Sequence, residues 1–565
     1  MAKRILIVGG VAGGASAAAR LRRLDEHAEI ILFERGPHIS FANCGLPYYI
    51  GGAIEQRDRL LVQTPDRFRA RFNVDVRLKN EVLKIERPKK QLRIRDLATG
   101  QDYAEPYDTL VLSPGAEAVR PSIPGIGSDR VFTLKNIPDM DAIAGFIETN
   151  KPTRAIVVGA GYIGLEMADN LHQRGLAVAI VEMTDQVMPL MDDEMAGFIQ
   201  EHLEKNNVAL WLGDAVAAFR EDSSGLVVNL KSGAELTCDF AILAVGVKPE
   251  TKLALEAGLE IGTTGGIKVN QYLQTSDPDI YAVGDAVEVK DFVLGTECLI
   301  PLAGPATRQG RIAADNICGR NVTYNGTQGT AILKVFDLTA AMTGATEKSI
   351  RKTDSEYEKI YIHPPDHATY YPGASRMHMK LLFTKPNGRI LGAQIVGAAG
   401  VDKRIDVLAT AIRAGMTVFE LRQLELAYAP PYGSAKDPVN MAGYVAANIL
   451  DGTVKVSHFD QLQDGDFVLD VRRPRELAKG ALPGAANIPV DELRQKLDDL
   501  PKEKTINCCC NVGFRSYIAC RILGQKGFNA RNLPGGYTSY RAQKYVGLSD
   551  ADRSRKLMDE FCPSS

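Results

Sequence analysis

Cys44 is the residue with the clearest potential for chemistry. It lies in the segment SFANCGLPY at residues 40–48, and the next cysteine along the chain is Cys238, so no local redox disulfide can form. A lone thiolate can cycle through a mixed disulfide with a substrate thiol, a persulfide or a sulfenic acid. We therefore expect Cys44 to act singly, and these three routes stay open.

A second reactive thiol is expected at Cys510, which begins the segment CNVGFRS at residues 510–516. This segment lies between an apolar strand and a helix that we expect to begin near Tyr517. Such a loop points its backbone N–H groups inward at a helix N-terminus, which lowers the pKa of a thiol and stabilises an anionic persulfide. Arg515 adds a cation, so Cys510 is the expected sulfur acceptor.

Cys508 and Cys509 directly precede this loop, and whether either resolves the persulfide is left open. Contiguous strand residues alternate between the two faces of a sheet, so the three cysteines cannot together form a tetrahedral zinc site. We expect no metal site. The nine cysteines contain no C-x-x-C pair, which disfavours a secreted disulfide scaffold and favours a reducing compartment.

The elements that must position these residues include an imperfect duplication. Residues 4–20 and 154–168 each consist of an apolar run, a glycine turn and a helix of small residues, and each is followed by an apolar run that ends in an acid, Glu34 or Glu182. This spacing is typical of βαβ units in which a helix N-terminus holds a pyrophosphate and the acid reaches the ribose hydroxyls. In the first turn Val11 stands at the position of the usual middle glycine, which in the second turn is Gly161.

Three further segments place a buried strand before a glycine turn, at residues 107–116, 238–249 and 275–286. The last of them ends in Gly284 and Asp285, where the acid could contact a ribitol or phosphate chain. With these segments the chain resembles the flavoprotein pyridine-nucleotide disulfide oxidoreductases over roughly residues 1–450. The resemblance implies FAD on the unit that begins at Gly9 and a nicotinamide cofactor on the inserted unit that begins at Gly159.

Glu182 favours NADH over NADPH, because a carboxylate would repel a 2′-phosphate. The residues expected to contact the two cofactors are Gly9, Val11, Ala12, Gly13, Gly14, Glu34, Arg35, Asn43, Gly115, Gly159, Gly161, Tyr162, Ile163, Gly164, Glu166, Glu182, Gly284 and Asp285.

The segment around Cys44, together with the turn GGVAGG, is similar to that of the coenzyme A-disulfide reductases. In the related NADH peroxidases and water-forming oxidases a histidine in the first glycine turn lies beside the reactive sulfur, whereas this chain has Ala12. This difference favours mixed-disulfide chemistry over a sulfenate. Glutathione-reductase-like members carry two cysteines in this region, and this chain carries one.

Coenzyme A needs cations for its phosphates. Helical spacing puts Ser16, Arg20 and Arg23 on one face of the first helix, and the resemblance implies the same use of that face. Ser40 and Asn43 are expected near the thiol end of the substrate, and Arg308 is a further candidate.

Two tyrosine-bearing segments, at residues 367–374 and 426–437, fall in the expected dimerisation domain. The resemblance implies that such tyrosines reach across a homodimer to the partner's cysteine, where a phenol can stabilise or protonate a departing thiolate. We favour Tyr371 and Tyr432, with Tyr370 and Tyr428 as alternatives.

From about Val456 the segments FVLDVR, GALPGAANIP, CNVGFRS and LPGGY follow in order and resemble a single rhodanese domain. The expected fold is therefore α/β, with two Rossmann-like nucleotide-binding domains, an α+β dimerisation domain and a C-terminal α/β rhodanese domain. The expected boundaries are 1–150 with 251–325 for FAD, 151–250 for NAD(P)H, 326–450 for dimerisation, 456–545 for the rhodanese and 546–565 for a tail. Residues 451–457 are expected to form a linker.

The near balance of 67 Lys plus Arg against 69 Asp plus Glu disfavours a nucleic-acid binder and a polybasic membrane anchor. No apolar stretch approaches the ~20 residues of a membrane span. Four glycines interrupt residues 5–19, which disfavours a signal peptide there. We expect a soluble cytoplasmic protein.

These features together predict an NADH-dependent flavoprotein reductase of coenzyme A persulfide or polysulfide sulfur that releases sulfide and also accepts coenzyme A disulfide. NADH would reduce FAD, which passes electrons to a disulfide at Cys44, while Cys510 handles sulfane sulfur. The alternatives are an NADH oxidase or peroxidase with a Cys44 sulfenate, and a sulfurtransferase relay centred on Cys510.

Overall fold

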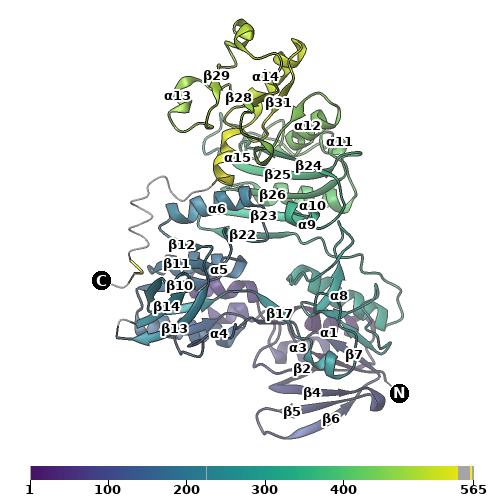
Figure 1. The fold of residues 1–565 in the computed structure, drawn as a ribbon. Coiled ribbons are helices and arrows are strands. Elements are labelled where there is room, and N and C mark those ends of the chain that lie inside the picture. Colours follow the sequence, from purple (N-terminus) through teal and green to yellow (C-terminus); the bar gives the residue numbers. More distant parts are fainter. Residues whose placement is uncertain (1, 224, 545–559, 563–565) are drawn as a thin grey trace. The chain divides into compact units, whose positions relative to one another are not determined.

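The computed structural model describes residues 2–223, 225–544 and 560–562 of the chain. These residues form two compact units (Figure 1). Unit 1 lies within residues 2–183, 214–329 and 561–562, and unit 2 lies within residues 184–213 and 330–560. Each unit is therefore assembled from segments that are distant in the sequence.

The first sheet of unit 1 is parallel, with the order β19-β7-β1-β2-β3. Its strands are β1 (Arg4–Val8), β2 (Glu29–Glu34), β3 (Asp75–Leu78), β7 (Thr109–Leu112) and β19 (Ile280–Ala282). Helices α1 (Ala12–Leu24) and α8 (Ala303–Ile317) pack together so closely that a Cβ on Gly310 would lie 2.3 Å from the carbonyl oxygen of Gly13. The unit also contains α3 (Pro65–Phe72) and the antiparallel strands β4 (Asn80–Glu86), β5 (Gln91–Asp96) and β6 (Asp102–Pro106).

The second sheet of unit 1 contains the parallel neighbours β11-β10-β16-β9. Its strands are β9 (Val131–Thr133), β10 (Arg154–Val158), β11 (Ala177–Glu182) and β16 (Phe240–Leu243), with α4 (Ile137–Asn150) and α5 (Tyr162–Gln173). An antiparallel sheet of β13 (Val216–Asp222), β14 (Gly225–Leu230) and β15 (Glu235–Cys238) accompanies it. The predicted duplication is confirmed, because β1-α1-β2 and β10-α5-β11 have the same order and pairing.

Shorter elements complete unit 1. They are α2 (Leu46–Ile50), β8 (Ala116–Ala118), β17 (Val247–Pro249), α7 (Lys252–Glu256), β18 (Ile267–Lys268), β20 (Val287–Lys290) and β21 (Glu297–Cys298).

Unit 2 contains an antiparallel sheet with the order β22-β23-β26-β25-β24. Its strands are β22 (Ala331–Val335), β23 (Leu338–Gly344), β24 (Tyr357–Ile362), β25 (Met377–Thr384) and β26 (Ile390–Gly397). Helices α6 (Asp193–Lys205) and α10 (Val401–Arg413) contact β23 and β26, and α12 (Pro438–Leu450) contacts β24. β12 (Ala209–Leu212), α9 (Glu347–Ile350) and α11 (Val418–Leu421) also belong to this unit.

The same unit holds a parallel sheet with the order β27-β31-β30-β28-β29. Its strands are β27 (Lys455–Val456), β28 (Phe467–Asp470), β29 (Ala486–Asn487), β30 (Ile506–Cys509) and β31 (Ala530–Asn532), and its helices are α13 (Pro474–Leu477), α14 (Phe514–Gln525) and α15 (Gly536–Gln543). Two expectations need correction here. The end of the expected linker is the strand β27, since Lys455 pairs with Arg531, and α14 begins at Phe514 rather than near Tyr517.

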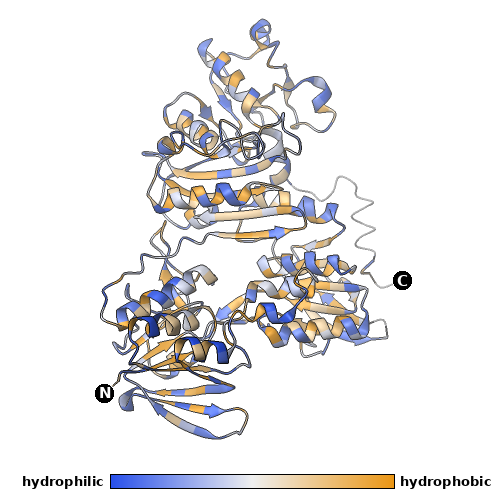
Figure 2. Cartoon of the chain, turned by 180° about the vertical axis from the view of Figure 1, so that it is seen from behind, coloured by the Kyte–Doolittle hydropathy of each residue, from blue (hydrophilic) through white to orange (hydrophobic). Residues whose placement is uncertain are grey.

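Hydrophobic residues concentrate along the central strands, which are mostly orange in Figure 2. All four residues of β7 and of β16, and all eight of β26, are buried. Continuous burial is what strands covered on both faces require. The expected α/β fold class is confirmed. Most of the expected tail, 546–565, lies outside the described residues.

Candidate functional site

Both glycine turns of unit 1 are shaped by close approaches of the backbone. A Cβ on Gly9 would lie 2.0 Å from the carbonyl oxygen of Ser113, and one on Gly14 would lie 1.9 Å from that of Gly9. In the second glycine turn a Cβ on Gly159 would lie 2.4 Å from the carbonyl oxygen of Ala244, and one on Gly164 would lie 2.0 Å from that of Gly159. Gly9 and Gly159 also have φ angles of +94° and +102°. Only glycine fits these positions, because a side chain would collide with backbone atoms.

The acids that end β2 and β11 hold these turns in the same way. Glu34 Oε2 accepts a hydrogen bond of 2.9 Å from the N–H of Gly10, and Glu182 Oε2 accepts one of 2.8 Å from the N–H of Ala160. Glu34 Oε1 also accepts from the N–H of Gly36 at 2.8 Å. Each carboxylate is therefore fixed beside its turn, with further lone pairs for a ribose hydroxyl.

The turns fit the pyrophosphate of a dinucleotide. Val11 and Gly161 occupy the same N-cap position of α1 and α5, and neither helix has a side-chain cap among the described residues. Tyr162 and Ile163 follow in the first turn of α5. A Cβ on Gly161 would meet no described atom within 4 Å, so an anion can approach the free N–H groups.

Other expected cofactor residues gather at the end of the first sheet. Gly115 and Gly284 have φ angles of +78° and +86°, and the N–H of Gly284 donates a 2.7 Å hydrogen bond to Gln309. Asp285 lies 3.7 Å from the ammonium of Lys135. Arg35 forms an ion pair with Glu250.

Cys44 lies on a single 3₁₀ turn, Asn43–Gly45, and is exposed. Asn43 Nδ2 donates to the carbonyl of Lys135 at 3.5 Å, which ties this turn to the segment before α4. Burial of the thiol, followed by the charges of Glu166 and Asp285, raises the pKa of Cys44, whereas Lys135 lowers it. Lys135 was missed by the sequence reasoning, because nothing near it in the sequence marks it as a neighbour of a thiol.

Tyr48 and Glu166 link the Cys44 turn to the second βαβ unit of unit 1, β10-α5-β11. The Tyr48 hydroxyl donates to Glu166 Oε1 at 3.2 Å, and α2 packs on α5. Burial, opposed by this hydrogen bond, raises the pKa of Glu166 to about 7. The charge of this carboxylate, when it is ionised, opposes formation of the Cys44 thiolate. Tyr48 was also missed, although it belongs to the Cys44 segment.

The residues expected to bind coenzyme A lie on α1, on α8 and in the loop before Cys44. Arg20 is held by Asp315, with Nε at 3.0 Å and Nη2 at 2.7 Å from Oδ1, whereas Arg23 and Arg308 are exposed. Ser40 has a φ of +46°, and its N–H donates to the carbonyl of Gly10 at 2.8 Å. A left-handed serine is a strained backbone position of the kind that functional sites retain.

The expected tyrosines lie on two loops of unit 2 that are fastened to each other. Tyr371 and Tyr432 are 44% and 73% exposed, and the hydroxyls of the alternatives Tyr370 and Tyr428 lie 2.8 Å apart. The buried Arg404 donates to the carbonyl of Asp366 at 2.8 Å and pairs with Asp437 at 2.9 Å, so it joins the two loops.

The loop at Cys510 has the expected form. Cys510 Sγ accepts hydrogen bonds from the N–H of Gly513 at 3.2 Å and from the Ser516 hydroxyl at 3.4 Å. Arg515 makes a two-pronged ion pair with Glu476, at 2.6 and 2.7 Å. The sulfur therefore lies at the N-terminus of α14 in a cradle of donors.

Cys508 and Cys509 are fully buried. A hydrogen bond with Cys520 and burial raise the pKa of Cys508 well above its usual value, and burial and Asp470 do the same for Cys509. Both side chains remain thiols at neutral pH and are poor nucleophiles.

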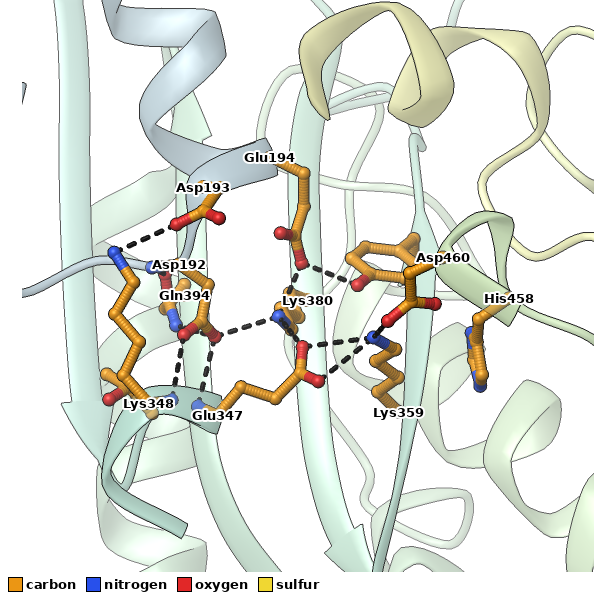
Figure 3. Close-up of polar contacts among 12 residues, drawn as sticks. Asp192, Asp193, Glu194, Glu347, Lys348, Lys359, Lys380, Gln394, His458 and Asp460 are labelled. Atoms are coloured by element: carbon orange, nitrogen blue, oxygen red, sulfur yellow. Dashed lines mark hydrogen bonds and ion pairs between the residues drawn. The ribbon is translucent and has the colours of Figure 1, made fainter. Parts of the chain in front are cut away.

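A buried ion cluster in unit 2 has the geometry of a metal site but contains an ammonium group. Oxygens of Asp192, Glu194 and Glu347 lie within 4.8 Å of one another. Figure 3 shows Lys380 Nζ between them, 2.8 Å from Asp192, 2.5 Å from Glu347 and in contact with Glu194. The lysine occupies the place that a cation would take.

Among residues 2–223, 225–544 and 560–562, no helix combines the length and the apolar character that a membrane span requires.

Known proteins resemble the chain along nearly its whole length. The family model for the pyridine nucleotide-disulphide oxidoreductases matches residues 3–310, that for their dimerisation domain matches residues 330–438, and that for the rhodanese-like domain matches residues 456–543. The coenzyme A disulfide reductase of Staphylococcus haemolyticus is 37% identical over 448 residues, which are 79% of this chain and 100% of that protein.

Two solved structures cover both units. The reduced CoADR-RHD of Bacillus anthracis has 51% identity and a TM-score of 0.94, and the match covers 96% of this chain and 98% of that one. An NAD-dependent persulfide reductase from A. fulgidus has 38% identity and a TM-score of 0.89, with 95% and 100% covered.

Proposed function

Because this chain belongs to the pyridine nucleotide-disulphide oxidoreductase family, we propose that it is an NADH-dependent reductase of coenzyme A persulfide, polysulfide and coenzyme A disulfide. The observation that carries the proposal is an exposed cysteine, Cys44, on a turn whose neighbouring residues are hydrogen-bonded both to the first glycine turn, through Ser40 and Gly10, and to α5, through Tyr48 and Glu166. A rhodanese-like domain, in which the buried Cys510 sulfur accepts hydrogen bonds at the start of α14, supports sulfane sulfur as part of the substrate.

In the proposed reaction, the Cys44 thiolate attacks a sulfur of the substrate. With coenzyme A disulfide, a coenzyme A thiolate leaves, and with coenzyme A persulfide attacked at its inner sulfur, hydrosulfide leaves. Both routes give a mixed disulfide between Cys44 and coenzyme A. Two electrons then release coenzyme A and restore the thiolate, and FAD, when bound with NADH, supplies them.

Residues of this chain would bind and orient FAD, NADH and coenzyme A. Glu34 and Glu182 fix the two turns for FAD and NADH, and the buried carboxylate of Glu182 disfavours the 2′-phosphate of NADPH. Ser40, Asn43 and the exposed Arg23 would orient coenzyme A, with Ser16, Arg20 and Arg308 along the adjacent helices. Lys135 and Glu166 would set the charge around the reactive sulfur.

A dimerisation domain supports a homodimer. In such a dimer, Tyr371 and Tyr432 of one subunit would protonate the departing thiolate at the Cys44 of the other. Their exposure of 44% and 73% leaves both phenols available for this contact.

The deciding experiment compares wild type, Cys44→Ser and Cys562→Ser for NADH oxidation with coenzyme A disulfide and with coenzyme A persulfide. Cys44→Ser should reduce both rates by at least about a thousandfold, the scale on which loss of a nucleophile acts. Cys562 is also exposed, so Cys562→Ser controls for loss of an accessible thiol and should match wild type. Turnover retained by Cys44→Ser would refute the proposal.

Two other functions are distinguished by these proteins together with a Cys510→Ser variant. An oxidase or peroxidase would consume NADH faster with oxygen or peroxide than with persulfide, and Ala12 in place of a histidine disfavours this. A relay centred on Cys510 would keep thiosulfate:cyanide transfer in Cys44→Ser, and Cys510→Ser would abolish NADH oxidation with persulfide as well as with polysulfide. The reductase proposal expects Cys510→Ser to impair polysulfide more than small persulfides.

A further inference from the structure

Helix α15 of the rhodanese-like domain packs against the Cys510 loop. The N–H of Tyr537 donates a 2.8 Å hydrogen bond to the carbonyl of Cys510, and that of Thr538 donates one of 3.0 Å to the carbonyl of Asn511. A Cβ on Gly536 would lie 2.2 Å from the carbonyl oxygen of Cys510, so the first turn of α15 and the loop touch through their backbones. A shift of α15 would therefore move the loop that carries the sulfur.

The last turn of the same helix lies against α6. A Cβ on Gly197 of α6 would lie 2.2 Å from the carbonyl oxygen of Ala542 and 2.9 Å from its carbonyl carbon. Gly197 is buried, and Arg541 beside it forms an ion pair of 2.8 Å with Glu201 of α6. Only glycine permits so close an approach, because any side chain at this position would collide with the backbone of α15.

Helix α6 comes from the oxidoreductase part of the sequence. It lies within residues 3–310, whereas Cys510 and α15 lie within residues 456–543, the two ranges that match the oxidoreductase and rhodanese-like family models. Both helices belong to unit 2. Ser539 of α15 also lies 3.0 Å from the buried His363, so α15 is fixed to the antiparallel sheet as well. A methyl group added to Gly197 would therefore strain or displace α15.

We propose that Gly197 is a positioning residue for sulfur transfer: it lets α15 lie at the distance from α6 at which the first turn of α15 fixes the Cys510 loop. Attack on a sulfane sulfur needs the attacking sulfur in line with the S–S bond of the donor, and a displacement of about 1 Å can cost about a hundredfold in rate. The oxidoreductase part thus helps to set the reactivity of the rhodanese-like part. This inference rests on the proposed role of Cys510 as sulfur acceptor.

The step to be measured is the uptake of one sulfur atom by Cys510. The Cys510 thiolate attacks the outer sulfur of a small alkyl persulfide, the S–S bond of the donor breaks, and the alkyl thiolate leaves with the electron pair. Mass spectrometry of the Cys510 peptide after rapid quenching gives the single-turnover rate. Repeating it over a range of donor concentrations gives a limiting rate and a half-saturating concentration.

The test compares Gly197→Ala with Gly524→Ala in the full-length protein. Both change a glycine within a helix, but a Cβ on Gly524 of α14 would meet no described atom within 4 Å. Gly197→Ala should lower the limiting rate by about tenfold to a hundredfold, while the half-saturating concentration changes little, because the loop is displaced and no donor contact is removed. Gly524→Ala should match wild type. Equal limiting rates in the two variants would overturn the proposal.

NADH oxidation with coenzyme A disulfide, which uses Cys44, shows whether Gly197→Ala is folded, and it should match wild type. Should that rate also be lost, a charge swap decides. Glu201→Lys places two cations opposite each other and should lower the limiting rate about threefold, the scale of an exposed charge pair. Adding Arg541→Glu restores opposite charges and should restore the rate. A rate that does not fall, or that the double variant does not recover, would overturn the proposal.

The proposed function fails on a different result. Polysulfide-dependent NADH oxidation that is unchanged in Cys510→Ser would refute the role of Cys510 as acceptor. Equal sulfur uptake in Gly197→Ala and Gly524→Ala, with polysulfide turnover impaired in Cys510→Ser, would refute only the positioning role of Gly197.

Discussion

At the scale of single residues, the protonation of the Cys44 thiol depends on its burial and on the charged side chains around it. Cys44 is exposed, yet burial of its sulfur and the carboxylates of Glu166 and Asp285 favour the thiol. Lys135 favours the thiolate, and its own ammonium lies 3.7 Å from Asp285. Burial of the sulfur, then the two carboxylates and the opposing cation, therefore decide how much thiolate is present at neutral pH.

Glu166→Gln should lower the pKa of Cys44, because it removes the largest charge that opposes the thiolate. The thiolate fraction at pH 7 would increase, and alkylation of Cys44 by iodoacetamide would become faster and would reach its plateau at a lower pH. The measurement is the alkylation rate of the Cys44 peptide against pH in reduced enzyme, read by mass spectrometry.

Glu117→Gln is the matched control, since Glu117 is exposed and pairs with Lys248 at 3.0 Å. It should leave the profile in place. A Glu166→Gln profile that coincides with wild type would show that this carboxylate does not act on the thiol.

At the scale of the secondary-structure elements, α6 begins beside a cluster of buried charges. Its first turn carries Glu194, and the preceding Asp192 accepts hydrogen bonds from the side-chain amide of Gln394 at 2.6 Å and from the N–H of Glu347 at 3.2 Å. Lys380, completely buried on β25, joins these acids (Figure 3). Burial alone would lower the pKa of this lysine, but the surrounding Tyr361, Glu194, Asp192 and Glu347 raise it well above its usual value.

Lys380→Met should lower the free energy of local opening of α6 by about 3–5 kcal/mol, because it leaves buried carboxylates without their shared cation. The loss should be smaller at pH 5 than at pH 8, since the uncompensated carboxylates can then take up protons in the folded state. Native-state hydrogen exchange of α6 peptides measures both effects.

Lys348→Met removes another lysine of the same cluster, which pairs with the exposed Asp193 at 2.9 Å. A surface pair contributes about 0–1 kcal/mol, so this variant should stay near wild type. Equal losses in the two lysine variants would mean that burial of the ammonium does not matter here.

In the molecule as a whole, the rhodanese-like domain is joined to the antiparallel sheet of unit 2 by polar contacts as well as by the chain. His458 Nε2 lies 2.7 Å from Glu358, and Arg541 of α15 pairs with Glu201 of α6 at 2.8 Å. His363 Nε2 lies 3.0 Å from the Ser539 hydroxyl of α15, and its Nδ1 lies 2.8 Å from Nδ1 of His378. The N–H of Tyr537 on α15 also donates a 2.8 Å hydrogen bond to the carbonyl of Cys510. The same helix therefore contacts both the Cys510 loop and the antiparallel sheet of unit 2.

Acidification should weaken this junction. Burial, with the cations of Arg376 and Arg541, lowers the pKa of His378 to about 3, and burial, His378 and Arg376 lower that of His363. An unfolded histidine binds a proton near pH 6.5, so local stability falls as the pH drops below that value, by about 1.4 kcal/mol per pH unit for each histidine that stays neutral.

Hydrogen exchange of α15 between pH 7.5 and 5.5, corrected for the intrinsic exchange rate, measures this slope. His378→Phe keeps a ring to stack on Phe198, whose centroid lies 3.7 Å away, and should flatten the slope. His27→Gln changes an exposed histidine and should leave the slope as in wild type. A pH-independent α15 in the wild-type protein would contradict the assignment of these two neutral imidazoles.

The sequence by itself determined the features that depend on residues close to one another in the chain. Gly9 and Gly159 must be glycine because of their φ angles and backbone contacts, and the acids about 20 residues later fall at the ends of the next strands. These features recur at fixed spacings, so the two βαβ units and the domain types could be read from the pattern. The start of α14 and the strand β27 were misread, because Gly513 as a helix cap and the pairing of Lys455 with Arg531 depend on neighbours that the local pattern does not contain.

The tertiary structure alone decided which charges meet. Lys135 and Glu166 come to Cys44 from about 90 and 120 positions away, Glu476 neutralises Arg515 across 39 residues, and Lys380 meets Glu194 across 186. No periodicity encodes such encounters, since they depend on how separate helices and sheets pack. They influence the protonation of the Cys44 thiol and pair the arginine of the Cys510 loop with a carboxylate, so the electrostatics of the two sites could be described only from the folded chain.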